Sequence, residues 1–301
     1  MNVTAGCMHD CAYCYIKGYS QYPGDKTVVL YTDTAERVAQ ELKRKRSKPR
    51  SVYFCPSSDA FQPRTEILDE SYRTMRILLE ADVGVEFVTK GEVPRRFLDL
   101  FASHRGLVSG QVGLITLDDD LNHVLEPGAP SAGRRLATVR RLIRAGVRTS
   151  LRIDPIIHGV TDSDQQLARL LSAARFCGVS SVSASFLFLR PAIRSSLRRG
   201  LAGDPLLARI LRPFDESDRQ GLRGGSRGAI ALPAETRRVA FARITDLAQR
   251  NGLELRICGC KNSDLVGTRC SLVREMQPLD STSVPPGEQS LPWPTATSDP
   301  R

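Results

Sequence analysis

Short apolar runs alternate with longer amphipathic stretches along most of the chain. The apolar runs predict strands at 51–55, 84–89, 108–115, 147–154, 180–188 and 253–258. Several of them, such as VEFVTK and VSASFLFL, are apolar on both faces, which is typical of parallel strands that helices cover. The amphipathic stretches predict helices at 34–45, 68–79, 94–103, 132–145, 163–176 and 234–250. This alternation predicts βαβ units and an α/β fold with a parallel sheet.

The later part of the chain departs from this pattern. Arg and Gly are frequent at 190–232 and the periodicity is weak there, whereas Pro, Ser and Thr dominate after residue 276. We therefore expect a main α/β domain at 1–190, a basic irregular flap at 191–233, a C-terminal helix, strand and cysteine motif at 234–276, and a disordered tail at 277–301.

Composition indicates a globular protein that is not embedded in a membrane. Of the 301 residues, 41% are hydrophobic and 25% are charged. No apolar run approaches the roughly 18–20 residues that span a bilayer, and the N-terminus lacks the basic and apolar regions of a secretory signal. We expect a cytoplasmic protein without a membrane partner.

The net charge is +10, and it is concentrated in one region. Residues 190–243 contain 12 Arg and only five acidic residues. Such an excess reflects either base composition bias in the gene or a surface that binds phosphate or carboxylate groups.

Three of the eight cysteines form the motif Cys7-x3-Cys11-x2-Cys14. Thiolates at this spacing can ligate three irons of a [4Fe–4S] cluster and leave the fourth iron open to a cofactor or substrate. Two alternatives remain, three buried structural cysteines or a zinc site with His9 as fourth ligand. A disulfide framework is not expected, because such frameworks belong to short secreted chains.

This motif, with Tyr13 before its third cysteine, resembles the radical S-adenosylmethionine (SAM) superfamily. The resemblance covers most of residues 1–190 and extends to the branch related to spore photoproduct lyase. Its further segments are FCPSSDAFQPRTE, FVTKGEV, TLDDDLNHVLEPGAPSAGRRL and IRAGVRTSLRIDPIIHGVTD. It implies a partial (β/α)6 barrel with a first strand just before Cys7, and a cluster whose open iron holds SAM. It also implies reductive cleavage of SAM to a 5′-deoxyadenosyl radical, with an external electron donor such as flavodoxin or ferredoxin.

The resemblance also assigns roles to individual residues. Cys7, Cys11 and Cys14 would ligate the cluster, and Tyr13 would contact the adenine of SAM. The amino and carboxylate groups of SAM need acceptors and a cation. The residues implied for these and neighbouring contacts are Ser58, Thr89, Lys90, Arg152 and Ser185.

Cys55 ends the second strand that the resemblance implies. It corresponds to the cysteine with which photoproduct lyases donate a hydrogen atom to a product radical. The alternative is a core cysteine, since free cysteines are among the most buried residues.

A second cysteine motif, Cys258-x-Cys260-x9-Cys270, follows the last predicted strand. Photoproduct lyases lack it. It can supply three ligands to a second iron–sulfur cluster, completed by Cys177 or a substrate group. Alternatively, one of the three is a radical-quenching thiol, the site binds zinc, or the cysteines are buried without a ligand. Lys261 and Arg269 would stabilise thiolate charge beside a metal.

These features fit more than one reaction. The favoured one is epimerisation of a sugar carbon in an oligosaccharide, because the chain is similar to radical enzymes of actinomycete antibiotic biosynthesis. The alternatives are a dehydrogenase with an auxiliary cluster, a DNA photoproduct lyase, and an iron–sulfur or nucleic-acid-binding module without catalysis. The sequence shows no aromatic platform for base stacking, so nucleic acid is the less expected partner. The positive flap favours a neutral or anionic glycoside over a cationic one.

Overall fold

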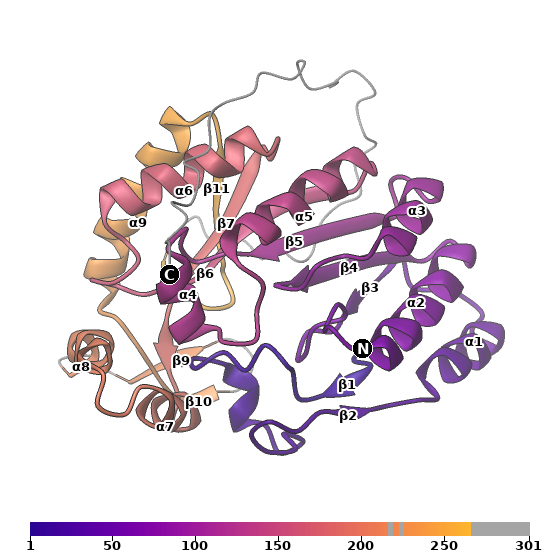
Figure 1. Cartoon of the computed structure of the whole chain (residues 1–301), viewed down its shortest axis with the longest axis horizontal. Coiled ribbons are helices and arrows are strands. Elements are labelled where there is room, and N and C mark those ends of the chain that lie inside the picture. The colour runs from indigo at the N-terminus through magenta and orange to yellow at the C-terminus, as the bar shows by residue number, and fades with distance from the viewer. Residues whose placement is uncertain (216–218, 223–225, 266–301) are drawn as a thin grey trace, which may run out of the picture.

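Six parallel strands form the central sheet of the computed structural model, which describes residues 1–215, 219–222 and 226–265 (Figure 1). Their order is β11-β7-β6-β5-β4-β3, and every neighbouring pair is parallel. The strands are β3 (Ser51–Phe54), β4 (Gly84–Thr89), β5 (Val108–Gly113), β6 (Arg148–Ile156), β7 (Ser181–Phe186) and β11 (Glu254–Ile257). The α/β fold and the partial barrel are confirmed, and all carboxyl ends of the strands meet at one edge of the sheet.

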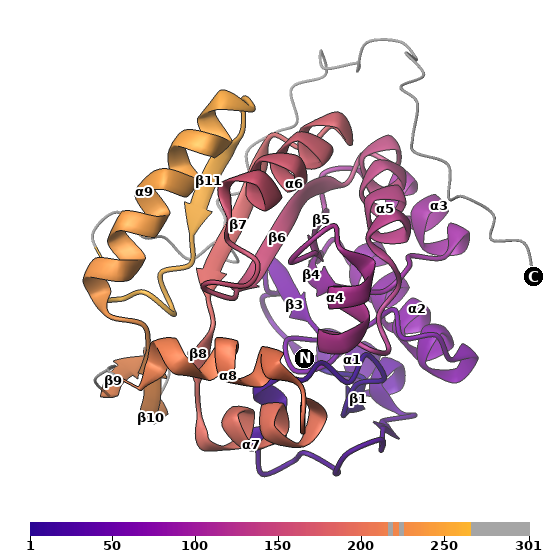
Figure 2. The ribbon, with the colours of Figure 1, turned by 60° about the vertical axis from the view of Figure 1, so that its left-hand side comes forward.

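Helices cover the outer face of the curved sheet (Figures 1 and 2). They are α1 (Thr34–Arg44), α2 (Thr65–Glu80), α3 (Arg95–Ser103), α5 (Ala132–Arg144), α6 (Asp164–Phe176) and α9 (Ala234–Arg250). Their bounds agree with the predicted ranges to within three residues. Among the described residues, no helix is both long and apolar enough to cross a bilayer.

The two faces of the sheet differ sharply in polarity, because successive side chains of a strand point to opposite faces. Phe87 packs outward against Phe61 and Phe101, with ring centres 5.1 and 5.8 Å apart. On the inner face, Gln111 and Arg152 are joined by a hydrogen bond of 2.9 Å. The inside of the barrel is therefore polar, unlike the branched apolar packing that fills a closed barrel.

The segment expected to form the first barrel strand, just before Cys7, lies along the β3 edge of the sheet, where Met1 donates to the carbonyl of Tyr53 at 2.9 Å and accepts from the N–H of Cys55 at 2.7 Å. It is not one of the six strands of the main sheet. The short strand β1 (Thr4–Ala5) pairs antiparallel with β2 (Val29–Leu30) in a separate two-stranded sheet. Gly6 turns the chain there, with a positive φ of 82° and no room for a Cβ atom beside the carbonyl of Thr27. The sixth strand of the main sheet is β11, which pairs with β7 and comes from the C-terminal segment.

Residues 191–233, expected to be irregular, contain several regular elements. These are α7 (Pro191–Gly200), α8 (Pro205–Leu211), the 3-10 turn η2 (Arg212–Phe214), β9 (Arg219–Leu222) and β10 (Ser226–Ala231), which pairs with β8 (Phe188–Leu189). Proline at the first position of both helices gives a start signal that outweighs the weak periodicity. The short helix α4 (Asp119–Leu125) was also not predicted, and its N-cap is Asp118. The tail expected at 277–301 lies outside the described residues.

Candidate functional site

A cavity of about 330 Å³ lies at the carboxyl edge of the sheet. It gathers most of the residues singled out in the sequence, which are Cys7, Cys11, Tyr13, Cys14, Cys55, Ser58, Thr89, Lys90, Arg152, Cys258 and Cys260. Ser185 is not part of its wall, and Cys270 lies outside the described residues. Cys177 ends α6 and does not line the cavity either. Two cysteine motifs separated by more than 240 residues in the chain thus share one cavity.

The N-terminal cysteine loop is held from two sides. The ring of His9 is hydrogen-bonded to the carbonyl of Gly128 at 3.1 Å and to the carboxylate of Asp59 at 3.0 Å. Met8 donates its backbone N–H to the side chain of Gln62 at 2.8 Å. A Cβ atom on Gly128 would stand 2.0 Å from the carbonyl oxygen of Met8, so the loop requires glycine at that position. These contacts hold the segment between Cys7 and Cys11 against the barrel.

The chemistry of this loop fits an iron–sulfur cluster. Burial raises the pKa of Cys7, Cys11 and Cys14, so their thiolates need a compensating positive centre. In the described part of the chain, no three His, Cys, Asp or Glu side chains converge as a single metal ion would require. A [4Fe–4S] cube places each thiolate on a different iron, so it does not need such convergence.

A buried ion pair supports the wall that carries Tyr13. Glu126 and Arg135 are both fully buried and form a salt bridge, and the Tyr13 hydroxyl donates to Glu126. Lys90 Nζ lies 3.8 Å from Glu126 and 5.8 Å from the centre of the Tyr13 ring. Burial raises the pKa of Glu126, although the charge of Arg135 opposes that rise. The sequence analysis assigned no role to Glu126 or Arg135, yet together they fix the orientation of Tyr13.

Thr89 and Ser58, both predicted to contact SAM, differ in the hydrogen bonds that their hydroxyl groups make. The Thr89 hydroxyl donates to Asp59 at 2.8 Å and accepts from the backbone of Gly91, so it supports Asp59. Ser58 lies beside Cys55, and its buried hydroxyl oxygen has no nitrogen or oxygen partner among the described residues and meets only the Cys55 sulfur. Sulfur is a weak hydrogen-bond partner, so Ser58 is suited to receive a polar group of a bound cofactor.

A second charged network lies across the cavity from Lys90. Arg152 and Lys261 both bind Asp154, with Lys261 Nζ 2.7 Å from each carboxylate oxygen. Burial opposes ionisation of Asp154, but Lys261 and Arg152 outweigh it and lower its pKa to about 2. Lys261, predicted to stabilise cysteine thiolates beside a metal, lines the cavity together with Cys258 and also pairs with Asp154 of β6.

Arg237 on α9 holds the second cysteine loop in place. Its guanidinium is 1% exposed and binds the side chains of Asn262 and Asp264, at 3.0 Å in each case. Asn262 in turn donates to the carbonyl of Cys258 at 2.9 Å and contacts Ser185. Ser185, predicted to contact SAM, is therefore a support for this loop behind the cavity wall. The clamp brings Cys258, which is 5% exposed, to the cavity.

Cys55 reaches the cavity from the opposite edge of the sheet. It follows β3 with a positive φ of 54°, and its backbone N–H donates to the carbonyl of Met1 at 2.7 Å. Burial raises the pKa of Cys55 to about 11, so its sulfur keeps its hydrogen at neutral pH. Cys55 and Cys258 thus follow the two edge strands of the sheet, β3 and β11.

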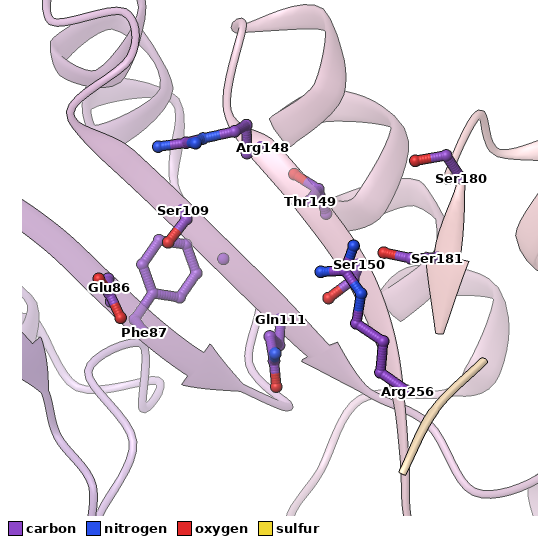
Figure 3. Close-up of a pocket in the computed structure, with 11 residues that line it drawn as sticks. Glu86, Phe87, Ser109, Gln111, Arg148, Thr149, Ser150, Ser180, Ser181 and Arg256 are labelled. Carbon is purple, nitrogen blue, oxygen red and sulfur yellow. The ribbon is translucent and has the colours of Figure 1, made fainter. Parts of the chain in front are cut away.

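A second cavity, of about 230 Å³, lies near the amino ends of the same strands (Figure 3). It is lined by hydroxyl groups and by Arg148 and Arg256, and Figure 3 shows Arg256 reaching toward Ser150. It contains none of the cysteines. The chemistry implied by the sequence therefore belongs to the cavity at the carboxyl edge.

Comparisons with known proteins agree with this geometry. The family model described as the radical SAM superfamily matches residues 1–171. The uncharacterised protein Rv2578c of Mycobacterium tuberculosis (strain ATCC 25618 / H37Rv) is 28% identical over 203 residues, which are 64% of this chain and 60% of that protein. A protein of Pseudomonas phage M6, described as a radical SAM Nalpha-GlyT isomerase, is 25% identical over 159 residues, 52% of this chain and 33% of its own.

A solved structure of spore photoproduct lyase, complexed with dinucleoside spore photoproduct, has a TM-score of 0.64 at 16% identity. The likeness covers 84% of this chain and 74% of that one, and at this identity it concerns the fold. The chain spans less than two thirds of the length of both sequence relatives.

Proposed function

This chain belongs to the radical SAM superfamily, and we propose that it is an isomerase that inverts a carbon of a sugar in an oligosaccharide of the antibiotic type. The observation that carries this proposal is the shared cavity, in which the N-terminal cysteine loop faces two buried thiols on opposite sheet edges. A radical epimerase needs a cluster site, which generates the radical that removes a hydrogen atom from a carbon. It also needs a thiol, which returns hydrogen to the opposite face of that carbon.

The residues of the cofactor side have separate tasks. Cys7, Cys11 and Cys14 would hold the cluster, and Ser58 and Lys90 would meet the polar end of SAM. When bound, the cluster and SAM supply a 5′-deoxyadenosyl radical that takes a hydrogen atom from the substrate. The electron would come from an external donor such as flavodoxin or ferredoxin.

Cys258 is the proposed hydrogen donor. Cys55 lies on the cofactor side, next to Ser58 and one strand from Lys90, whereas Cys258 follows β11 at the far edge of the sheet. A donor on the far side delivers hydrogen to the face opposite to the one that lost it. The Cys258 S–H bond breaks, a C–H bond forms on the substrate radical, and a thiyl radical remains. One electron from the external donor and one proton from water restore the thiol.

The wall of the cavity supports a sugar as the substrate. Phe186 and Phe188 give it an apolar side, and Arg152, Asp154 and Lys261 give it donors and acceptors for hydroxyl groups. Asp154 binds both Arg152 and Lys261 but neutralises only one of their two positive charges. The group therefore suits the hydroxyls of a neutral or anionic sugar better than a cationic one.

Dehydrogenation with an auxiliary cluster is the second candidate. The observation in its favour is that Cys258 and Cys260 both line the cavity. A cluster there would accept the second electron from the substrate radical, and the product would lack two hydrogens. Cys270, the third cysteine of the motif, would have to join them.

The first experiment tests the radical chemistry and the donor separately. Anaerobically reconstituted protein, reduced with dithionite and given SAM, should form 5′-deoxyadenosine, and the triple variant of Cys7, Cys11 and Cys14 to alanine should form none. With substrate present, Cys258→Ser should still form 5′-deoxyadenosine but no isomerised product, whereas Cys55→Ser should retain the product. Absence of 5′-deoxyadenosine would overturn the proposal as a whole, and loss of product only in Cys55→Ser would move the donor role to Cys55.

A further inference from the structure

A smaller cavity of about 190 Å³ adjoins the main one. It lies between the β1–β2 sheet and the segment around the 3-10 turn η1 (Tyr15–Gly18). Ile16, Tyr19 and Ser57 line both cavities, so the two cavities are neighbours. A ligand with two connected rings would reach both if it passed over the rim that these side chains form.

Three tyrosines border this smaller cavity: Tyr19, Tyr22 and Tyr31. Tyr19 and Tyr31 are each 40% exposed, although large aromatic rings are usually covered in a folded protein. The three rings are close in the sequence, since Tyr19 and Tyr22 follow η1 and Tyr31 directly follows β2.

Two of the three tyrosines, Tyr19 and Tyr22, are held in place without a ligand. Tyr15 contacts the edge of the Tyr19 ring, with centres 5.7 Å apart. The Tyr22 hydroxyl donates to Asp25 at 2.7 Å, and Asp25 is bound by Arg199 of α7 at 3.2 Å. Because these contacts fix the rings of Tyr19 and Tyr22 beforehand, binding loses little conformational entropy at these two residues.

The lining of this cavity is uncharged. Its polar side chains are those of Asn2, Thr4, Gln21 and Ser57 together with the tyrosine hydroxyls, and it includes no Lys, Arg, Asp or Glu. A phosphodiester group would require cationic partners, which the lining does not offer. A neutral sugar ring has an apolar C–H face that can stack on tyrosine and a rim of hydroxyls that amides and hydroxyls can bind.

We propose that this tyrosine-lined cavity is a second subsite, which binds the neutral sugar ring next to the ring that reacts. This inference rests on the proposed oligosaccharide isomerase and names the part of the substrate that provides binding specificity. The reacting ring would enter the main cavity, and the neighbouring ring would stack on Tyr31 and Tyr19.

The test is binding to the reconstituted 301-residue chain with SAM, measured on an array of neutral and anionic oligosaccharides. The neutral trisaccharide that gives the strongest signal is then titrated against wild type, Tyr31→Ala, Tyr31→Phe and Phe176→Ala. Phe176 is a matched control because it is an exposed aromatic residue, 58% accessible, at the end of α6 and outside these cavities. The dinucleotide dTpT is titrated in parallel as the competing ligand class.

We expect Tyr31→Ala to bind about tenfold more weakly, since loss of one stacking ring has an effect of that order. Tyr31→Phe and Phe176→Ala should bind as wild type does, and 5′-deoxyadenosine formation without substrate should be equal in wild type and Phe176→Ala. Absence of neutral oligosaccharide binding, equal affinity in Tyr31→Ala, or stronger binding of dTpT would each overturn the subsite. Failure of 5′-deoxyadenosine formation would instead overturn the proposed function, so the two failures are distinguishable.

Discussion

Replacing Arg237 with methionine tests whether the second cysteine loop is positioned by α9. Methionine keeps an unbranched apolar stem in place of the arginine stem but removes the guanidinium. That group donates to the carbonyl of Leu232 at 2.8 Å and to the side chains of Asn262 and Asp264. The substitution therefore releases the loop that carries Cys258 without opening a large hole in the core.

The expected loss of stability is about 3 kcal/mol. Removing one partner of a buried ion pair costs roughly 3–5 kcal/mol. The lower end applies because Asp264 is 34% exposed and regains water when the guanidinium is lost. The Asn262 side chain also loses a partner, and its hold on Cys258 weakens.

The assay combines urea denaturation with product analysis. Arg237→Met should lower the free energy of unfolding by about 3 kcal/mol and should form 5′-deoxyadenosine with less isomerised product per turnover, because Cys258 is no longer held in position. The matched control is Arg238→Met on the same helix, whose side chain is 69% exposed and pairs with Glu235. That control should change stability by less than about 0.5 kcal/mol. Equal losses in the two variants, or an unchanged ratio of product to 5′-deoxyadenosine in Arg237→Met, would refute the clamp.

Two further substitutions test the other supports of the cavity. Asp154→Asn should destabilise the protein by about 2 kcal/mol at pH 7, since Lys261 loses its partner. The folded-state pKa of Asp154 is lowered to about 2, so its contribution is present above pH 4 and is lost as the pH falls toward 2. Unfolding free energies measured from pH 7 to pH 2 should therefore fall less steeply in the variant, and parallel curves would contradict the pairing. Gly128→Ala should lower bound iron per chain, because its Cβ would stand 2.0 Å from the carbonyl of Met8. Gly133→Ala, where nothing lies within 4 Å, is its control; equal iron in both variants would show that the loop tolerates the clash.

Local sequence patterns predicted where most helices and strands lie, but not which strands pair with one another. The apolar runs located the six strands of the main sheet because burial on both faces leaves a signal within each run. They did not show that β1 pairs with β2, nor that β11 pairs with β7, because pairing depends on contacts between distant segments. The helices at 191–211 were missed because arginines interrupt their apolar positions.

In the candidate site, too, local sequence patterns showed some residues, whereas others come together only in the folded chain. Cysteine spacing identified the cavity residues Cys7, Cys11 and Cys14 without any structure. The supports of that cavity could not be found in this way, because their partners are far apart in the chain. His9 is 119 residues from Gly128, and Lys261 is 107 residues from Asp154. Charged residues at such separations leave no periodic signal, so only the folded chain shows that they meet.

The central claim is that Cys258 returns a hydrogen atom to the substrate carbon. The measurement that tests it most directly is the mass of the product formed in D2O, since a thiol exchanges its hydrogen with solvent. The expected product is isomeric with the substrate and carries one deuterium at the inverted carbon, and Cys258→Ser should form no such product. A product lighter by two hydrogens, or a deuterated isomer that Cys258→Ser still forms, would contradict it.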